Sequence, residues 1–137
     1  MTESQPGSQS EEGTAPEAIR VLLVDDNAVV RRGLRTFFDL LDDIEVVGEA
    51  GDGLEAVAQA KRLTPDVILM DLLMPNLDGL GAITAIKEGQ PEIEIVAVTS
   101  FIEEEKVTSA LEAGATGYLL KDAEADEVAA AVRRPCR

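Results

Sequence analysis

Polar side chains of three chemical kinds follow directly after apolar runs of this sequence. They are the carboxylates of Asp25, Asp26 and Asp71, the hydroxyl of Thr99 and the ammonium group of Lys121. Carboxylates held close together repel one another, by roughly 4 kcal/mol per pair at about 4 Å and an effective dielectric of 20. A divalent cation relieves that repulsion, and ligation by oxygen alone favours a hard ion. The three acids therefore predict a Mg²⁺ site.

Asp71 also has the chemistry of a phosphoryl acceptor. It follows Val67–Met70, an apolar run at whose end an uncompensated charge is costly to bury. A phosphoryl group on its carboxylate would place new oxygens beside the cation, where Lys121 neutralises them and the Thr99 hydroxyl donates to one. Positioning and electrostatics supply most of the acceleration of such a transfer. We therefore expect phosphoryl transfer to Asp71, assisted by Thr99 and Lys121.

Each of these residues also has an ordinary structural interpretation. Asp25 or Asp26 suits the cap of a helix that begins near Ala28, because short polar side chains accept hydrogen bonds from free N–H groups there. Taken alone, Thr99 is a common β-branched strand residue and Lys121 a common solvated lysine. Their joint placement after successive apolar runs is what favours a shared site.

The composition argues against several other chemistries. The 137-residue chain has no His, which excludes Ser-His-Asp and Cys-His catalysis, phosphohistidine carriage and zinc sites that use His. Its single cysteine, Cys136, is interpreted as a tail thiol. The net charge of −15 disfavours binding of nucleic acid or of an anionic membrane by this chain. No apolar run approaches the roughly 20 residues of a membrane span, and no signal peptide is evident, so we expect a cytoplasmic protein.

Short apolar runs alternate with longer stretches of helical period. Residues 18–134 are assigned to one domain, 1–17 to a disordered acidic tail and 135–137 to a C-terminal tail. The expected strands are Ile19–Val24, Ile44–Glu49, Val67–Met70, Ile93–Val98 and Gly117–Leu120. The expected helices are Ala28–Leu41, Gly53–Arg62, Asp78–Glu88, Glu103–Ala113 and Glu124–Arg134.

This alternation predicts a doubly wound α/β fold, a parallel sheet with a helix after each strand. We expect five strands and five helices in this fold, with the flavodoxin-like strand order 2-1-3-4-5. Near-continuous apolar strands fit a sheet that is covered on both faces. The carboxyl ends of such strands meet at one crevice, where the polar residues would converge. The second strand runs into Gly51-Asp52, as expected for an edge strand away from the crevice. Gly48–Gly53 lacks the spacing of a phosphate-binding loop and is interpreted as a turn and helix entry.

Several motifs resemble, in order and spacing, those of the receiver domains of bacterial response regulators. The resemblance covers roughly residues 19–134. The motifs are Val21–Asn27 (VLLVDDN), Met70–Gly79 (MDLLMPNLDG), Val98–Ser100 (VTS) and Gly117–Lys121 (GYLLK). The resemblance implies that Asp71 accepts phosphate from the phosphohistidine of a sensor histidine kinase. It also implies that Asp26 ligates Mg²⁺ directly, that Asp25 does so directly or through water, and that the Leu73 carbonyl is a further ligand.

The resemblance implies a switch as well. In the family, the threonine that matches Thr99 moves toward the phosphoryl group, and the aromatic that matches Tyr118 turns inward into the vacated space. Lys121 would bind the phosphoryl oxygens. Without the family, Tyr118 is an ordinary half-buried strand aromatic. The chain would catalyse its own phosphorylation and dephosphorylation without being a metabolic enzyme, and phosphorylation would favour a homodimer.

The end of the last motif resembles the NarL/FixJ-type subfamily. Many receivers place a cis Pro after the lysine, whereas here Asp122 follows, which leaves the isomer of that bond open. Members of the subfamily usually carry a C-terminal helix-turn-helix that binds DNA and regulates transcription. The chain stops at Arg137 with no residues for such a domain. We expect a truncated response regulator, with a stand-alone receiver as the alternative.

Two other functions are weighed against this one. A pseudo-receiver that acts only through protein contacts is disfavoured because Asp26, Asp71, Thr99 and Lys121 are all present. An aspartyl-phosphate phosphohydrolase generally carries a second acid two residues after the nucleophile, where this chain has Leu73.

Overall fold

Each apolar run predicted as a strand forms one, and a helix follows each strand. The computed structural model describes residues 18–74, 76–99 and 104–134. Its elements are β1 (Ile19–Val24), α1 (Ala28–Phe38), β2 (Ile44–Ala50), α2 (Gly53–Leu63), β3 (Val67–Asp71), α3 (Gly79–Gly89), β4 (Glu94–Thr99), α4 (Glu104–Ala113), β5 (Gly117–Leu120) and α5 (Ala125–Arg133).

The strands form one parallel sheet in the order β2-β1-β3-β4-β5, which confirms the predicted fold class. β2 lies at an edge, as expected, and its pairing with β1 shifts register between Val21 and Leu22. Every residue of β3 is buried, in keeping with a strand covered on both faces. Because all strands run in the same direction, their carboxyl ends lie along one edge of the sheet.

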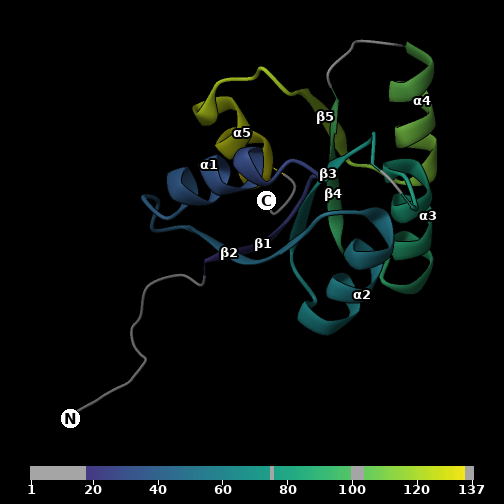
Figure 1. Ribbon diagram of the computed structural model, residues 1–137, viewed down its shortest axis with the longest axis horizontal. Coiled ribbons are helices and arrows are strands. Elements are labelled where there is room, and N and C mark those ends of the chain that lie inside the picture. Colours follow the sequence, from purple (N-terminus) through teal and green to yellow (C-terminus); the bar gives the residue numbers. More distant parts are fainter. Residues whose placement is uncertain (1–17, 75, 100–103, 135–137) are drawn as a thin grey trace.

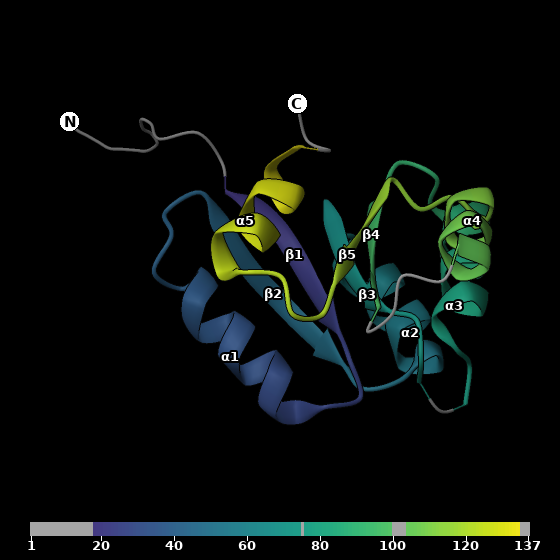
Figure 2. The same ribbon diagram turned by 90° about the horizontal axis from the view of Figure 1, so that it is seen from above.

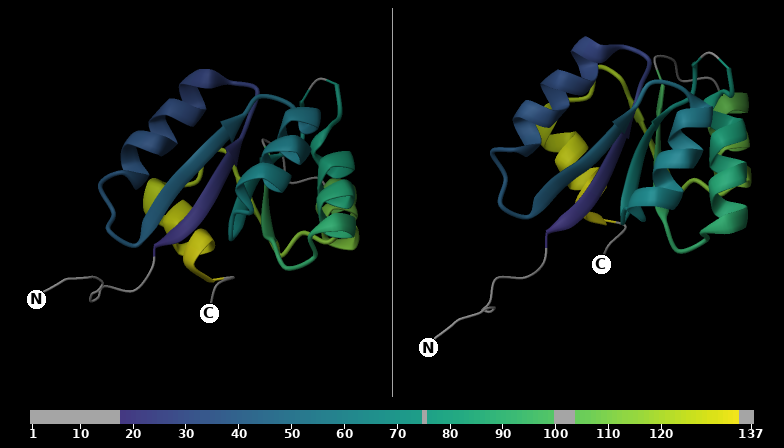
Figure 3. Two further views of the ribbon diagram at one scale, coloured as in Figure 1. Left: turned by 90° about the horizontal axis from the view of Figure 1, so that it is seen from below. Right: turned by 60° about the horizontal axis from the view of Figure 1, so that its bottom comes forward.

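Helices cover both faces of the sheet. α1 and α5 lie on one face, and α2, α3 and α4 lie on the other (Figures 1 and 2). Figure 3 shows the same layers from two further directions. Successive residues of one strand point to opposite faces, so Leu22 and Ile68 join the core under α2 and α3, while Leu23 and Leu69 join the core under α1 and α5.

Side-chain caps mark where α1 and α3 begin. The carboxamide oxygen of Asn27 accepts from two amides in the first turn of α1, and Asp78 accepts from an amide of α3. The capping interpretation of Asp25 and Asp26 is therefore wrong, because the next residue along the chain performs that role.

The first helix ends earlier than predicted, at Phe38 instead of Leu41. The amides of Leu40 and Leu41 donate to the carbonyls of Phe37 and Phe38, at 3.1 and 2.9 Å, and so form a turn tighter than an α-helix. Leu41 still packs against the core, which explains why its spacing matched the helical period.

The other boundaries differ from the prediction by single residues. β3 and β4 each extend by one residue to include Asp71 and Thr99. β4 begins after Ile93, whose amide donates to the Gln90 carbonyl in a turn (3.2 Å). α3 begins after Asp78 because that residue is the cap. β2 extends to Ala50, α2 to Leu63 and α3 to Gly89, and α5 spans Ala125–Arg133.

Several predictions fall on residues outside the described ones: the tails 1–17 and 135–137 with Cys136, and Glu103 of the fourth helix. In the described part of the chain, no helix has the length and apolar character that a membrane crossing requires. The same part contains no cis peptide bond, so the Lys121–Asp122 bond is trans.

Candidate functional site

Three carboxylates converge at the carboxyl edge of the sheet. One oxygen from each of Asp25, Asp26 and Asp71 lies within 4.8 Å of the others. β1 and β3 are neighbours in which Val24 pairs with Met70, so the residues that follow these two lie side by side. Asp25 and Asp71 are buried, with 5% and 1% exposed, whereas Asp26 is exposed. The predicted acidic cluster is therefore present in the fold.

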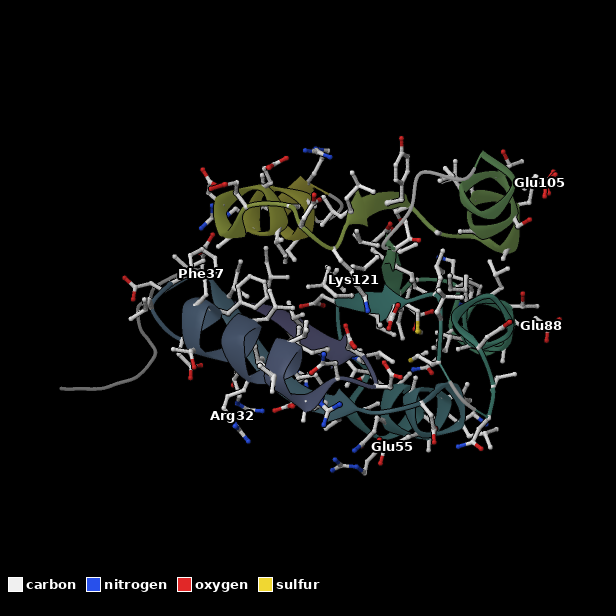
Figure 4. The ribbon with its side chains drawn as sticks, turned by 45° about the horizontal axis from the view of Figure 1, so that its top comes forward. Arg32, Phe37, Glu55, Glu88, Glu105 and Lys121 are labelled. Carbon is white, nitrogen blue, oxygen red and sulfur yellow. The ribbon has the colours of Figure 1, made fainter. Side chains whose placement is uncertain are left out.

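Lys121 brings a positive charge to this cluster from the end of β5. Its Nζ atom lies 3.1 Å from Asp71 Oδ2 and 3.5 Å from Asp25 Oδ2. The Lys121 backbone amide donates to the Thr99 carbonyl at 2.8 Å. This hydrogen bond holds the backbone of Lys121 against the end of β4. Figure 4 shows the Lys121 side chain reaching inward from β5 over the middle of the molecule.

The proton equilibria of this pair reflect burial and mutual attraction. Burial raises the pKa of Asp71, with a further increase from the Asp25 charge, and outweighs the hydrogen bonds from Lys121 and from the Leu73 amide. For Lys121, burial lowers the pKa, but its hydrogen bond to Asp71 and the charges of Asp71 and Asp25 raise it by more. The lysine therefore stays protonated, while Asp71 carries an electrostatic cost when it is ionised.

The β1–α1 loop that carries the acidic pair is held by its neighbours. The Asn27 amide donates to Asp25 Oδ1 at 2.8 Å. The Arg31 guanidinium donates to the Asp25 carbonyl and, through Nε, to Glu49 Oε1 at 2.9 Å. Arg35 donates to the other Glu49 oxygen at 2.7 Å. Burial opposes ionisation of Glu49, yet the two arginines together lower its pKa, so β2 supplies a fixed anion that anchors Arg31 against the loop.

The β3–α3 loop begins directly after Asp71. The Leu73 amide donates to Asp71 Oδ1 at 3.2 Å, and the Gly79 amide donates to the Leu72 carbonyl at 3.1 Å. A Cβ atom on Gly79 would lie 2.3 Å from the Asp71 carbonyl oxygen, a contact that side chains do not tolerate. Because Gly79 has no Cβ atom, α3 can begin in contact with the backbone of Asp71.

The two predicted switch residues lie on β4 and β5. Thr99 is the last residue of β4 and is 1% exposed, beside the strand that ends in Asp71. Tyr118 lies on β5 and is 45% exposed, over a small cavity that Val96 and Ala131 also line. The ring is therefore a partly exposed strand aromatic in this structure.

Reasoning from the sequence missed several residues that shape the site. Asn27 and Arg31 both contact Asp25, and the signal that could have identified Arg31 is its position one helical turn after Asn27, the cap of α1. The sequence also placed Asp52 away from the crevice. Asp52 lies outside the acidic cluster, and its carboxylate accepts a hydrogen bond at 2.7 Å from the Asn76 side chain, in the loop that follows Asp71.

The ligand chemistry of the acidic cluster fits a hard divalent cation. All three side chains offer carboxylate oxygens, and two of them are buried, where unneutralised charge is costly. Among the described residues, Lys121 is the cation paired with Asp25 and Asp71, so negative charge is in excess. Mg²⁺ commonly uses one or two carboxylates and retains water or phosphate oxygens in its other positions.

An apolar cavity of about 310 Å³ adjoins the acidic cluster between α1, α5 and the sheet. Leu34 and Phe37 line it from α1, and Val128 lines it from α5. Figure 4 places Phe37 on the side of α1 that faces α5. Phe38 is the one fully buried residue of α1, and Val29 at the rim is 73% exposed. The cavity therefore extends along α1 from its start beside the site to Phe37.

Comparisons with known proteins agree with this architecture. The chain matches the family model described as response regulator receiver domain over residues 21–133. Response regulator protein VraR of Staphylococcus aureus is 49% identical over 119 residues, which are 87% of this chain and 57% of VraR. The chain thus spans little more than half the length of that curated relative.

Solved structures with similar folds include two receiver domains. The signal receiver domain of the response regulator NarL from Mycobacterium tuberculosis superposes with a TM-score of 0.83 at 35% identity, covering 87% of this chain and 96% of that one. The response regulator domain of CheB from Thermotoga maritima superposes with a TM-score of 0.81 at 38% identity, with the same coverage of 87% and 96%.

Proposed function

Because the chain belongs to the family of response regulator receiver domains of two-component systems, we propose that it accepts a phosphoryl group on Asp71 from a sensor histidine kinase. The observation that carries this proposal is the surroundings of Asp71. Asp71 is 1% exposed, one oxygen of each of two further carboxylates lies within 4.8 Å of its own, and Lys121 Nζ lies 3.1 Å from Oδ2. A buried acceptor with a neighbouring ammonium group suits transfer of an anionic group to a carboxylate.

Asp25, Asp26 and Asp71 would hold Mg²⁺, with the Leu73 carbonyl as a further ligand. When bound, the cation supplies positive charge that screens the acids from one another and from the incoming phosphoryl oxygens. The excess of negative charge and the all-oxygen donor set support this assignment.

Asp71 acts as the nucleophile in its ionised form. One of its oxygens attacks phosphorus, and the P–N bond of the kinase phosphohistidine breaks as the P–O bond of an aspartyl phosphate forms. The electron pair leaves with the imidazole nitrogen, which takes a proton from solvent. Lys121, whose pKa is raised by its acidic neighbours, stays charged and balances the added phosphoryl oxygens. The Thr99 hydroxyl donates to one of those oxygens.

The phosphorylated state would then differ from the free state at β4 and β5. Thr99 moves toward the phosphoryl group, and the Tyr118 ring, 45% exposed here, turns inward. This change favours a homodimer and, in a longer chain, controls a DNA-binding domain that regulates transcription. The domain acts in the cytoplasm and turns over only its own phosphoryl group.

Beryllofluoride, which mimics a bound phosphoryl group, tests the proposal together with acetyl phosphate. In the presence of Mg²⁺, the wild type is expected to bind beryllofluoride and to form a phosphoprotein, whereas Asp71→Asn does neither. Asp66→Asn serves as a control because Asp66 precedes β3 at the opposite end of the strand. Equal labelling of wild type and Asp71→Asn would reject Asp71 as the acceptor.

A further inference from the structure

Asp52 makes two contacts with its two carboxylate oxygens. Oδ1 accepts from the Glu55 amide at 2.8 Å and so caps α2. Oδ2 accepts from the Asn76 side-chain amide at 2.7 Å, across 24 residues of sequence. Both contacts stabilise the ionised form, and together they lower the pKa of Asp52. The first contact belongs to a helix start, but the second joins α2 to the loop that follows Asp71.

The neighbouring residues in the two segments lie in direct contact. A Cβ atom on Gly53 would lie 1.9 Å from the Leu77 carbonyl oxygen, so the start of α2 approaches the loop backbone as closely as glycine permits. Leu77 in turn packs against the core shared by α2 and α3. Asn76 has a φ of +68°, a left-handed conformation that Asn tolerates better than most residues. The Asp52–Asn76 contact therefore adds to a close fit between backbones.

The position of this contact matters because of what the loop carries. The described residues of the β3–α3 loop begin with Leu72 and Leu73, directly after Asp71, and the Leu73 amide donates to Asp71 Oδ1 at 3.2 Å. At its far end, Gly79 lies against the Asp71 carbonyl. Both ends of the loop thus contact Asp71. Between these ends, the Asn76 side chain donates a hydrogen bond to Asp52, which lies outside the loop.

We propose that Asp52 and Asn76 are positioning residues, a latch between α2 and the β3–α3 loop that keeps the Leu73 backbone oriented toward the acidic site. The proposal rests on the proposed function, because it assigns the latch a role in cation binding by Asp71 and Leu73. Neither residue contacts the acidic cluster itself.

Removal of the latch can be separated from loss of the helix cap. Serine is a good N-cap residue, but its one short hydroxyl group cannot both cap α2 and reach Asn76, so Asp52→Ser keeps the cap and loses the latch. Asn76→Gly removes the other partner and tolerates positive φ. Asp78→Ser is the matched control, because it makes the same change at the cap of α3, where the carboxylate accepts from Gly81 of its own helix.

Two measurements test the latch. The first is amide hydrogen exchange across residues 72–78 in the metal-free protein. The second is the Mg²⁺ dissociation constant from calorimetric titration. Asp52→Ser and Asn76→Gly are each expected to speed exchange and weaken Mg²⁺ binding by about threefold to tenfold, as for loss of one hydrogen bond. The double variant should match the single ones, because both substitutions break one contact. Asp78→Ser should stay within about twofold of wild type in Mg²⁺ affinity.

The outcomes separate the latch from the proposed function. Wild type that fails to bind Mg²⁺ would reject the assigned cation site, while the exchange data still report on the loop. If the wild type binds Mg²⁺ and the single variants keep its Mg²⁺ affinity or its rate of amide exchange, the proposed latch is overturned. Effects that multiply in the double variant would overturn it too, because the two residues would then act separately.

Discussion

The Nζ atom of Lys121 lies 3.1 Å from Oδ2 of Asp71, although 50 residues separate them in sequence. β3, which ends in Asp71, and β5, which precedes Lys121, are not neighbours in the sheet, because β4 lies between them. The ion pair therefore spans the carboxyl end of β4, beside Thr99. It gives the buried acid a counter-charge and holds the two strand ends in one arrangement.

Replacement of Lys121 by Met should destabilise the metal-free protein at neutral pH. The substitution keeps most of the apolar stem but leaves Asp25 and Asp71 facing each other without an ammonium group. Because the lysine side chain is 29% exposed, we expect a loss of roughly 1–2 kcal/mol, less than for a fully buried pair. Urea denaturation at pH 7 measures it. The same change at the exposed Lys61 should have little effect, and equal effects at both positions would show that the ion pair contributes nothing.

Replacement of Asp71 by Asn should stabilise the metal-free protein, and the gain should depend on pH. Burial raises the pKa of Asp71, so the folded state binds this proton more tightly than the unfolded state does. The contribution of Asp71 to the stability of the wild type is therefore fully present below the ordinary aspartate pKa. It is lost as pH rises through the raised pKa of the folded state. The Asn variant lacks that loss, so its advantage should grow from acidic pH and level off above the raised pKa.

Urea midpoints measured across a pH series in a chelator would test this dependence. Asp126→Asn, at an exposed position in α5, controls for the change in net charge. An advantage of Asp71→Asn that shrinks with rising pH would contradict the assigned direction of the pKa.

Mg²⁺ should stabilise the folded protein through the acidic cluster. A ligand that binds only the folded state at ten times its dissociation constant adds about 1.4 kcal/mol to the free energy of unfolding. We expect such a gain for wild type in thermal or urea unfolding at constant ionic strength, and its loss in Asp26→Asn. Glu45→Gln, at an exposed position in β2, should respond as wild type does. A gain that Na⁺ reproduces at equal ionic strength would indicate screening instead of a site.

Two glycine substitutions should have opposite effects on stability. Gly33 lies within α1, and a Cβ atom there would meet no heavy atom within 4 Å. Gly33→Ala should therefore raise the free energy of unfolding by roughly 0.5–1 kcal/mol, through helix propensity. Gly53→Ala should lower it, because its Cβ would lie 1.9 Å from the Leu77 carbonyl oxygen. Urea denaturation measures both, and a destabilised Gly33→Ala variant would show that the added methyl group meets a neighbouring side chain.

Much of the fold was predictable because hydrophobic periodicity is a local property. The apolar runs at Ile19–Val24 and Gly117–Leu120 form strands with the predicted bounds, and the other elements deviate mainly at their ends. End residues depend on caps and turns, as the tight turn after Phe38 shows. The spacing of apolar residues carries no information about such contacts. Leu41 was therefore predicted to belong to α1, although it lies after the end of that helix.

The acidic site was predictable for a topological reason. When all strands of a sheet are parallel, the residues that follow them share one edge, so Asp25, Asp71 and Lys121 had to converge once the fold class was recognised. The sequence alone therefore determined the fold class, the edge at which the chemistry lies and the charged groups that face one another there.

Only the tertiary structure decided which other side chains support that edge. Asp52 follows the edge strand β2 and lies outside the acidic cluster, and the packing of α2 against α3 brings its carboxylate to Asn76 in the loop that follows Asp71. Arg31 likewise reaches the Asp25 carbonyl because Glu49 on β2 holds its guanidinium group. Such contacts depend on how helices sit on the sheet and how far a side chain reaches across loops. These are long-range properties that no local pattern of residues encodes.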